Sequence, residues 1–202
     1  MKKEPRKKKM AKKTRKTAKQ KTAAGRIAAD PTAKELVDRF IRVDHAGEYG
    51  ATRIYAGQLA VLGENHPLCP TIRHMAAQED VHLDHFNHLI TQRGVRPTAL
   101  TPFWHVAGFA LGAATALMGE KAALACTAAV EDVIDEHYRE QLDSLGSDEQ
   151  ELAETIEKFR QEELEHHDTA LDLGAADTPG YELLSGLIKG GCRLAIKVAE
   201  KI

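Results

Sequence analysis

Apolar residues recur along this chain at alternating steps of three and four, the period of one face of an α-helix. No stretch alternates with the period of a strand, so the fold class is expected to be all-α. Thr32 with Glu35, and Ser147 with Gln150, have the spacing of capping boxes that open helices. The pattern predicts four long helices, over residues 32–62, 70–93, 120–145 and 147–173.

Each of these four apolar stripes is interrupted by ionisable residues. Glu163 and His166 occupy adjacent inward positions of the last helix, one turn apart, as Glu79 and His82 do in the second. The first and third helices each carry a single inward glutamate. Burying an unpaired carboxylate is costly, so a compensating ligand is expected. The complete set is Glu48, Glu79, His82, Glu131, Glu163 and His166.

The order of these residues indicates a duplicated helix pair that forms an antiparallel four-helix bundle. Glu79 follows Glu48 by 31 residues, and Glu163 follows Glu131 by 32. A single inward glutamate such as Glu48 would by itself be read as a solvated residue at the edge of a face. Together, however, the two Glu-x-x-His pairs and two further glutamates match the ligand set of di-iron and di-manganese four-helix bundles. Four carboxylates would also neutralise two divalent ions, and carboxylate with imidazole suits iron or manganese.

Two further segments raise the question of a membrane. Residues 103–117 are uncharged but fall short of the roughly 20 residues that span a bilayer, so they predict either a buried core helix or a segment lying in a membrane face. Residues 181–202 predict an amphipathic helix with one apolar and one basic face. It could pack on the bundle or lie on an anionic membrane surface. Its basic residues are Lys189, Arg193, Lys197 and Lys201.

Composition favours one folded domain over residues 31–202, preceded by a basic arm at residues 1–30. The chain has 202 residues, 43% of them hydrophobic, enough for one core. Residues 1–26 hold 13 of the 28 Lys and Arg and a single acid, which leaves 15 basic against 29 acidic residues in the remainder. The arm contains no apolar segment of a secretory signal and is expected to be disordered. Attraction to anionic lipid is favoured over nucleic acid, and a tail without a role is the alternative.

The cysteines and the membrane-related segments together suggest a location. Cys69, Cys126 and Cys192 are odd in number and lack metal-site spacing, so they are expected to be reduced thiols in a cytoplasmic environment. The basic arm, the apolar segment and the amphipathic end all favour contact with lipid. We therefore expect a peripheral membrane protein on the cytoplasmic face of a cell membrane.

Four motifs resemble the demethoxyubiquinone hydroxylase family of ubiquinone biosynthesis. They are Asp-His-Ala-Gly-Glu-Tyr-Gly-Ala at residues 44–51, Arg-Ile-Tyr-Ala-Gly-Gln at 53–58, Phe-Ala-Leu-Gly-Ala at 109–113 and Glu-Glu-Leu-Glu-His-His-Asp at 162–168. The likeness covers roughly residues 35–202 and leaves out the basic arm.

The resemblance implies a ferritin-like bundle that binds two iron ions, associates with a membrane and hydroxylates the ring of a polyprenylated demethoxyquinol with O2. It implies that the six inward residues are the iron ligands and catalytic residues, with Glu79 and Glu163 bridging the irons. Tyr55 and Tyr138 are candidates to line the substrate pocket, with core packing as the alternative, and Arg193 could meet the quinone head group or a phospholipid. Homo-oligomers and accessory proteins of quinone biosynthesis are possible partners.

Two other functions fit parts of the pattern. A ferritin-type ferroxidase uses the same bundle but needs neither the apolar segment at 103–117 nor the basic amphipathic end. A helical membrane or scaffold protein without metal would predict no bound iron.

Overall fold

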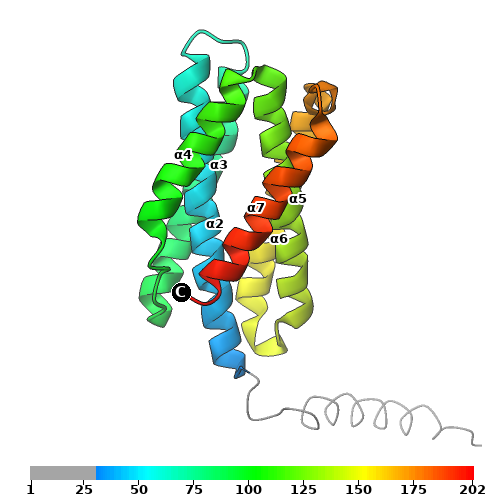
Figure 1. The fold of residues 1–202 in the computed structure, drawn as a ribbon. Coiled ribbons are helices and arrows are strands. Elements are labelled where there is room, and N and C mark those ends of the chain that lie inside the picture. Colours follow the sequence, from blue (N-terminus) through cyan, green and yellow to red (C-terminus); the bar gives the residue numbers. More distant parts are fainter. Residues whose placement is uncertain (1–30) are drawn as a thin grey trace, which may run out of the picture. The chain divides into compact units, whose positions relative to one another are not determined.

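The computed structural model describes residues 31–202, and the compact unit that carries the fold runs from Leu36 to Ile202. The described residues form six α-helices, two short 3₁₀ turns and no strand (Figure 1), which confirms the predicted all-α class. The basic arm predicted for residues 1–30 lies outside this range. The helices are α2 (Ala33–Leu62), α3 (Cys69–Arg93), α4 (Thr101–Leu117), α5 (Glu120–Ser144), α6 (Gln150–Asp172) and α7 (Tyr181–Ala199), with 3₁₀ turns η1 (Ser147–Glu149) and η2 (Ala175–Asp177).

The helix boundaries follow local chemistry, with one exception to the prediction. At the start of α2 the capping box is formed, because the Glu35 backbone N–H donates to Thr32 Oγ1 at 3.2 Å and the Thr32 N–H donates to Glu35 Oε2 at 2.8 Å. The capping box predicted at Ser147 and Gln150 is wrong. Residues 147–149 form the 3₁₀ turn η1 instead, and the Gln150 side chain donates to Glu154 Oε1.

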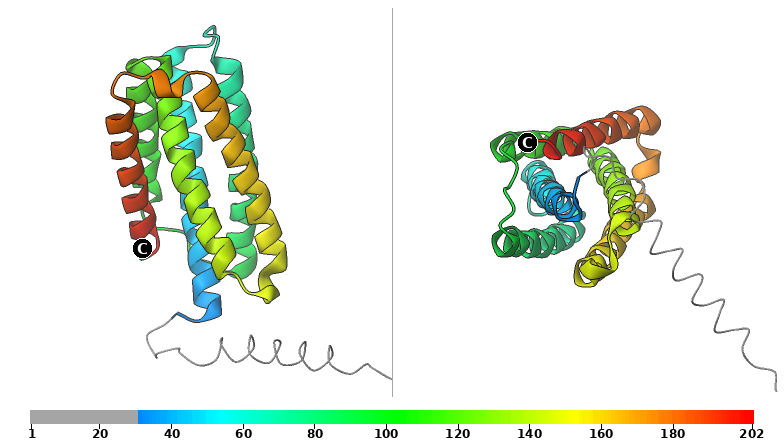
Figure 2. Two further views of the ribbon diagram at one scale, coloured as in Figure 1. Left: turned by 90° about the vertical axis from the view of Figure 1, so that its right-hand side faces the viewer. Right: turned by 90° about the horizontal axis from the view of Figure 1, so that it is seen from below.

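Helices α2, α3, α5 and α6 form the predicted antiparallel bundle, while α4 and α7 lie on one side of it (Figure 2). Two apolar core clusters divide the bundle along its length. Since α2 and α6 run opposite to α3 and α5, each cluster takes residues from before the inward glutamates of one of these two pairs and from after those of the other. One contains Ile41, Phe86, Tyr138, Ile156 and Phe159; the other contains Tyr55, Ile72, Met75, Leu124 and Ala170. The six inward polar residues therefore lie between two apolar regions.

Glycines bring the backbones of α2 and α4 into direct contact. A Cβ atom added at Gly112 would lie 1.9 Å from the carbonyl oxygen of Ile54, and one at Gly57 would lie 2.2 Å from the carbonyl oxygen of Phe109. No side chain fits at these distances without moving a helix. The glycine of the motif at residues 109–113 thus sets how closely α4 packs on the helix that carries Glu48.

We expect Gly112→Ala to lower the free energy of unfolding by about 3 kcal/mol, at the upper end of the cost of overpacking. Gly190→Ala in α7 is the matched control, because an added Cβ there meets no atom within 4 Å. That substitution should be neutral or stabilise by about 0.5–1 kcal/mol. Thermal unfolding monitored by circular dichroism compares the two. Equal melting temperatures would contradict the close helix contact.

The apolar helix α4 is not a buried core helix, so that interpretation of residues 103–117 is wrong. Only Gly112, Thr115 and Ala116 are buried, whereas Phe103, Val106 and Leu117 are exposed. Helix α7 likewise exposes Leu183, Leu187 and Leu194. Among the described residues no helix has the length and apolar character needed to cross a membrane.

The basic face of α7 is partly engaged with the bundle. Lys189 forms an ion pair with Asp132, and Arg193 pairs with Glu136 at 2.8 Å, both on α5. The contact that the structure gives Arg193 is therefore to an acid of α5, whereas the sequence had suggested a quinone head group or a phospholipid. Lys197 and Lys201 remain exposed at the end of the chain. All three cysteines are free thiols, as predicted.

Candidate metal centre

The structure brings all six inward residues together in two overlapping clusters. Cluster 1 consists of Glu48, Glu79, His82 and Glu163, and cluster 2 consists of Glu79, Glu131, Glu163 and His166. Within each cluster the potential ligand atoms all lie within 4.8 Å of one another, and all six residues are buried. Each cluster thus offers three carboxylates and one imidazole. The two clusters share the glutamates of the Glu-x-x-His pairs, the residues that the family resemblance makes bridging.

The histidine Nδ1 atoms face the carboxylates. His82 Nδ1 lies 3.0 Å from Glu163 Oε1 and 3.5 Å from Glu48 Oε2. His166 Nδ1 lies 3.2 Å from both Glu79 Oε1 and Glu163 Oε2. Because both rings present the same nitrogen to the centre, their Nε2 atoms point outward and are available to other partners.

Burial and neighbouring charges shift the pKa values of these groups, upward for some of the glutamates and downward for another. Burial, with the charge of Glu163, raises the pKa values of Glu79 and Glu131 well above the ordinary 4.5. Burial also disfavours charge on Glu163, but His166 and His82 outweigh it and lower its pKa to about 2. Likewise Glu163 and Glu48 outweigh the burial of His82 and raise its pKa to about 11. Without a metal, protons therefore occupy part of the centre.

The residues fit a pair of divalent metal ions. Glu79 Oε1, His82 Nδ1 and Glu163 Oε1 are buried and make no hydrogen bond of normal geometry, although the last two lie 3.0 Å apart. Buried polar atoms of this kind call for a partner, and a cation shared by several oxygens and a nitrogen would supply it. The oxygen-rich donor set with one imidazole per cluster is suited to iron or manganese.

Residues outside the six hold the clusters in place, and the sequence pattern missed two of them. The side chain of His82 pairs through Nε2 with Glu162 Oε2 at 2.8 Å, and that of His166 pairs through Nε2 with Gln78 Oε1 at 3.0 Å. Each partner directly precedes the glutamate of the opposite Glu-x-x-His pair, and this sequence signal could have found them. Such bonds fix the ring orientation and leave Nδ1 as the ligand atom.

The two tyrosines predicted near the site bind its glutamates. Tyr55 O–H donates to Glu131 Oε1 at 3.0 Å, and Tyr138 O–H donates to Glu48. Each tyrosine lies seven residues beyond the single inward glutamate of its own helix and reaches the glutamate of the other. Both are fully buried among core residues, so they orient carboxylates and also fill the core.

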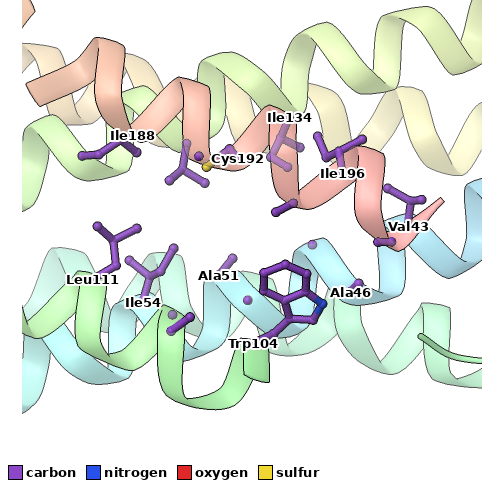
Figure 3. A pocket seen from close by; sticks show the side chains of 18 of the residues that line it. Val43, Ala46, Ala51, Ile54, Trp104, Leu111, Ile134, Ile188, Cys192 and Ile196 are labelled. Atoms are coloured by element: carbon purple, nitrogen blue, oxygen red, sulfur yellow. The ribbon is translucent and has the colours of Figure 1, made fainter. Parts of the chain in front are cut away.

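An apolar cavity of about 460 Å³ lies beside the helices that carry Glu48 and Glu131 (Figure 3). Its volume is within the range of roughly 300 to 1,000 Å³ typical of ligand pockets. Helices α4 and α7 contribute Trp104, Leu111, Ile188 and Ile196, and Figure 3 shows these side chains facing one another across it with those of α2. Ala51 of α2 and Ile134 of α5, each three residues beyond its glutamate, line it as well.

Comparison with known proteins identifies the family. A family described as ubiquinone biosynthesis protein COQ7 matches residues 35–199. The chain belongs to the COQ7 family. It is 57% identical over 182 residues to the 3-demethoxyubiquinol 3-hydroxylase of Rhodospirillum rubrum, covering 90% of this chain and 86% of that protein. The NADPH-dependent 3-demethoxyubiquinone 3-hydroxylase, mitochondrial, of Homo sapiens is 51% identical over 180 residues, covering 87% and 82%.

A third COQ7 relative, the 5-demethoxyubiquinone hydroxylase, mitochondrial, of Saccharomyces cerevisiae, is 45% identical over 183 residues, covering 83% of this chain and 78% of that protein. The family predicted from the four motifs is thus confirmed, and the match extends along nearly all of the described chain. These COQ7 relatives are named as hydroxylases. The protein is an enzyme of the hydroxylase type.

Proposed function

We propose that this protein hydroxylates the ring of a polyprenylated demethoxyquinol in ubiquinone biosynthesis, using O2 at a centre of two iron ions. The observation that carries this proposal is the pair of overlapping carboxylate–histidine clusters, together with an apolar cavity lined by helix neighbours of Glu48 and Glu131. A hydrophobic ring substrate needs such a cavity, and O2 activation needs a redox metal. The names of the relatives supply the substrate class.

In this proposal the iron ligands are Glu48, Glu79, His82, Glu131, Glu163 and His166. The bound irons would supply the electrons and the Lewis acidity needed for O2 activation. The chain holds its ligands through the tyrosines and the partners of the two histidines, and the apolar regions on either side exclude water. Since the cavity is lined by neighbours of Glu48 and Glu131, a ring placed there would approach the centre from the side of α2 and α5.

The direct test is a reaction with defined components. The iron-loaded protein is incubated with a demethoxyquinone, a chemical reductant and ¹⁸O2, and the product is analysed by mass spectrometry. One labelled oxygen atom per ring is expected. Rapid oxidation of Fe(II) without any labelled product would overturn the proposal in favour of a ferroxidase of the ferritin type.

The protein is further proposed to be a peripheral membrane protein on the cytoplasmic face, with α4 and α7 against lipid. Both helices line the cavity and both expose apolar side chains, so a polyprenyl tail could pass from lipid to the ring site between them. Phe103 is 59% exposed, Val106 67% and Leu194 64%, and none of them lines the cavity. These three residues define the surface that we expect to contact lipid.

We expect the triple substitution Phe103→Ser, Val106→Ser and Leu194→Ser to weaken binding to anionic liposomes at every salt concentration, because apolar burial is not screened by salt. Turnover of a long-tailed quinol should fall about 10-fold, the effect of losing a little over 1 kcal/mol. Val81→Ser on α3 is the matched control, since Val81 is 58% exposed on a helix that does not line the cavity. Liposome flotation measures binding. Wild-type binding by the folded triple variant would place the membrane contact elsewhere.

Deletion of residues 1–26 separates the electrostatic contribution to liposome binding from the apolar one. Each Lys or Arg near an anionic leaflet contributes about 1 kcal/mol, and salt screens this attraction. The deletion should therefore weaken liposome binding at low ionic strength only. Unchanged binding at low salt would remove the arm from the membrane proposal.

A further inference from the structure

The two clusters have chemically identical ligands but different surroundings. Each contains three glutamates and one histidine, and each has one glutamate that accepts a hydrogen bond from a tyrosine. The halves of the chain are related by an offset of 83 or 84 residues, so the partners of one cluster can be compared position by position with those of the other.

The first difference lies in the partners of the histidines. His82 of cluster 1 is bound by the carboxylate of Glu162, whereas His166 of cluster 2 is bound by the amide oxygen of Gln78, and these two partners occupy equivalent positions. The ring of His82 is fully buried, and the Glu162 side chain is 24% exposed. Lys158 lies 3.5 Å from Glu162, but it is 63% exposed and its charge is screened by water.

The second difference, in the residues that precede the single glutamates, also places an acid on the side of cluster 1. Four residues before Glu48 of cluster 1 stands Asp44, whose Oδ1 accepts a hydrogen bond from Gln141 Nε2 at 2.5 Å. At the equivalent position before Glu131 of cluster 2 stands Thr127, contacted in the same way by Gln58 at 3.4 Å. Asp44 Oδ1 also lies 3.3 Å from His137 Nε2, while its Oδ2 is buried and makes no hydrogen bond. Both equivalent pairs thus place an acid beside cluster 1 and a neutral residue beside cluster 2.

We propose that the two metal positions are unequal, with cluster 1 binding its metal first and more tightly, and that Glu162 is the positioning residue chiefly responsible. A carboxylate that accepts the Nε2–H of His82 draws the proton toward itself and makes Nδ1 a stronger donor than the amide of Gln78 can make that of His166. The carboxylate of Glu162 also places a negative charge near cluster 1, which favours a cation there. This inference rests on the metal centre proposed above.

Anaerobic titration of the apoprotein with Co(II) against a competing chelator tests the inequality without any turnover. His166→Ala leaves cluster 1 with its full ligand set, and His82→Ala does the same for cluster 2. We expect the His166→Ala protein to bind one Co(II) about 10- to 100-fold more tightly than the His82→Ala protein, the usual effect of a partner to a metal-bound histidine. Equal affinities would overturn the proposal.

The role of Glu162 is isolated by swapping the two partners. Glu162→Gln should weaken Co(II) binding about 10-fold or more in the His166→Ala background and leave the His82→Ala background unchanged. Gln78→Glu should strengthen binding in the His82→Ala background. A Glu162→Gln effect of equal size in both backgrounds would show a general structural role and overturn the assignment. If the wild-type apoprotein binds fewer than two Co(II) ions, the metal centre itself fails.

Discussion

Replacing Glu163 with alanine is expected to abolish both metal binding and hydroxylation, whereas replacing His166 should remove only part of the metal. Glu163 belongs to both clusters, and His166 belongs to cluster 2 alone. Anaerobically purified wild-type protein should hold two irons per chain, the His166→Ala protein about one and the Glu163→Ala protein almost none. Activity should fall at least about 100-fold in each, since loss of a ligand exceeds the loss of a ligand's partner.

The matched control for these variants is Glu165→Ala. Glu165 lies between the two ligands on α6, but its side chain is exposed to solvent. Iron analysis by mass spectrometry and an assay of labelled product measure both effects on the same samples. Full iron occupancy in a Glu163→Ala/His166→Ala double variant would refute the ligand assignment, as would equal losses in the Glu165→Ala protein.

The helices and the meeting of the six inward residues could be predicted from sequence because both follow from periodicity. A helix that packs in a bundle must turn one stripe inward, so Glu79 and His82 on such a stripe could only point to the bundle centre. The duplication then required the two helix pairs to bring their glutamates together. The structure shows this arrangement as two shared clusters.

The partners of the histidines could not be predicted in the same way. Gln78 and Glu162 lie beside the stripe, and whether such a residue reaches another helix depends on the helix spacing and rotation that packing decides. The exposure of α4 is a similar case. An apolar run such as residues 103–117 has the same composition in a core and on an exposed surface, and the glycine contacts with α2 determine which face is covered.

The contacts of the basic residues of α7 also depend on tertiary structure. The four-residue repeat of Lys189 and Arg193 correctly indicated a basic face, but not that acids of α5 would lie opposite it. Asp132 and Glu136 carry the same spacing on α5, so the two helices pair in register. Charge patterns of this kind predict complementarity only after the neighbouring helices are known.

Removal of the metal is expected to lower the melting temperature by roughly 10 °C or more. At a free metal concentration of 100 times the Kd, each occupied site adds about 2.7 kcal/mol to the free energy of unfolding.

The apoprotein is also expected to lose stability as the pH rises. Glu79 and Glu131 have pKa values raised by burial, so above about pH 4.5 the folded state holds protons that the unfolded chain has released. The raised pKa of His82, about 11, has the same effect on stability, because above pH 6.5 the folded state keeps a proton that the unfolded chain loses. Glu163, with a pKa of about 2, adds stability that is lost only in acid.

Glu131→Gln should therefore act in opposite directions on the two forms of the protein. In the apoprotein it removes a buried carboxylate while its amide oxygen can still accept the Tyr55 O–H, so the melting temperature should rise, and rise more at pH 8 than at pH 6. In the metal-loaded protein it removes a ligand of cluster 2, so the melting temperature should fall. Differential scanning calorimetry with and without metal measures both, and Glu165→Gln, at an exposed position, should change neither. A Glu131→Gln apoprotein that melts no higher than the wild-type apoprotein at pH 8 would show that the buried carboxylates do not strain the fold.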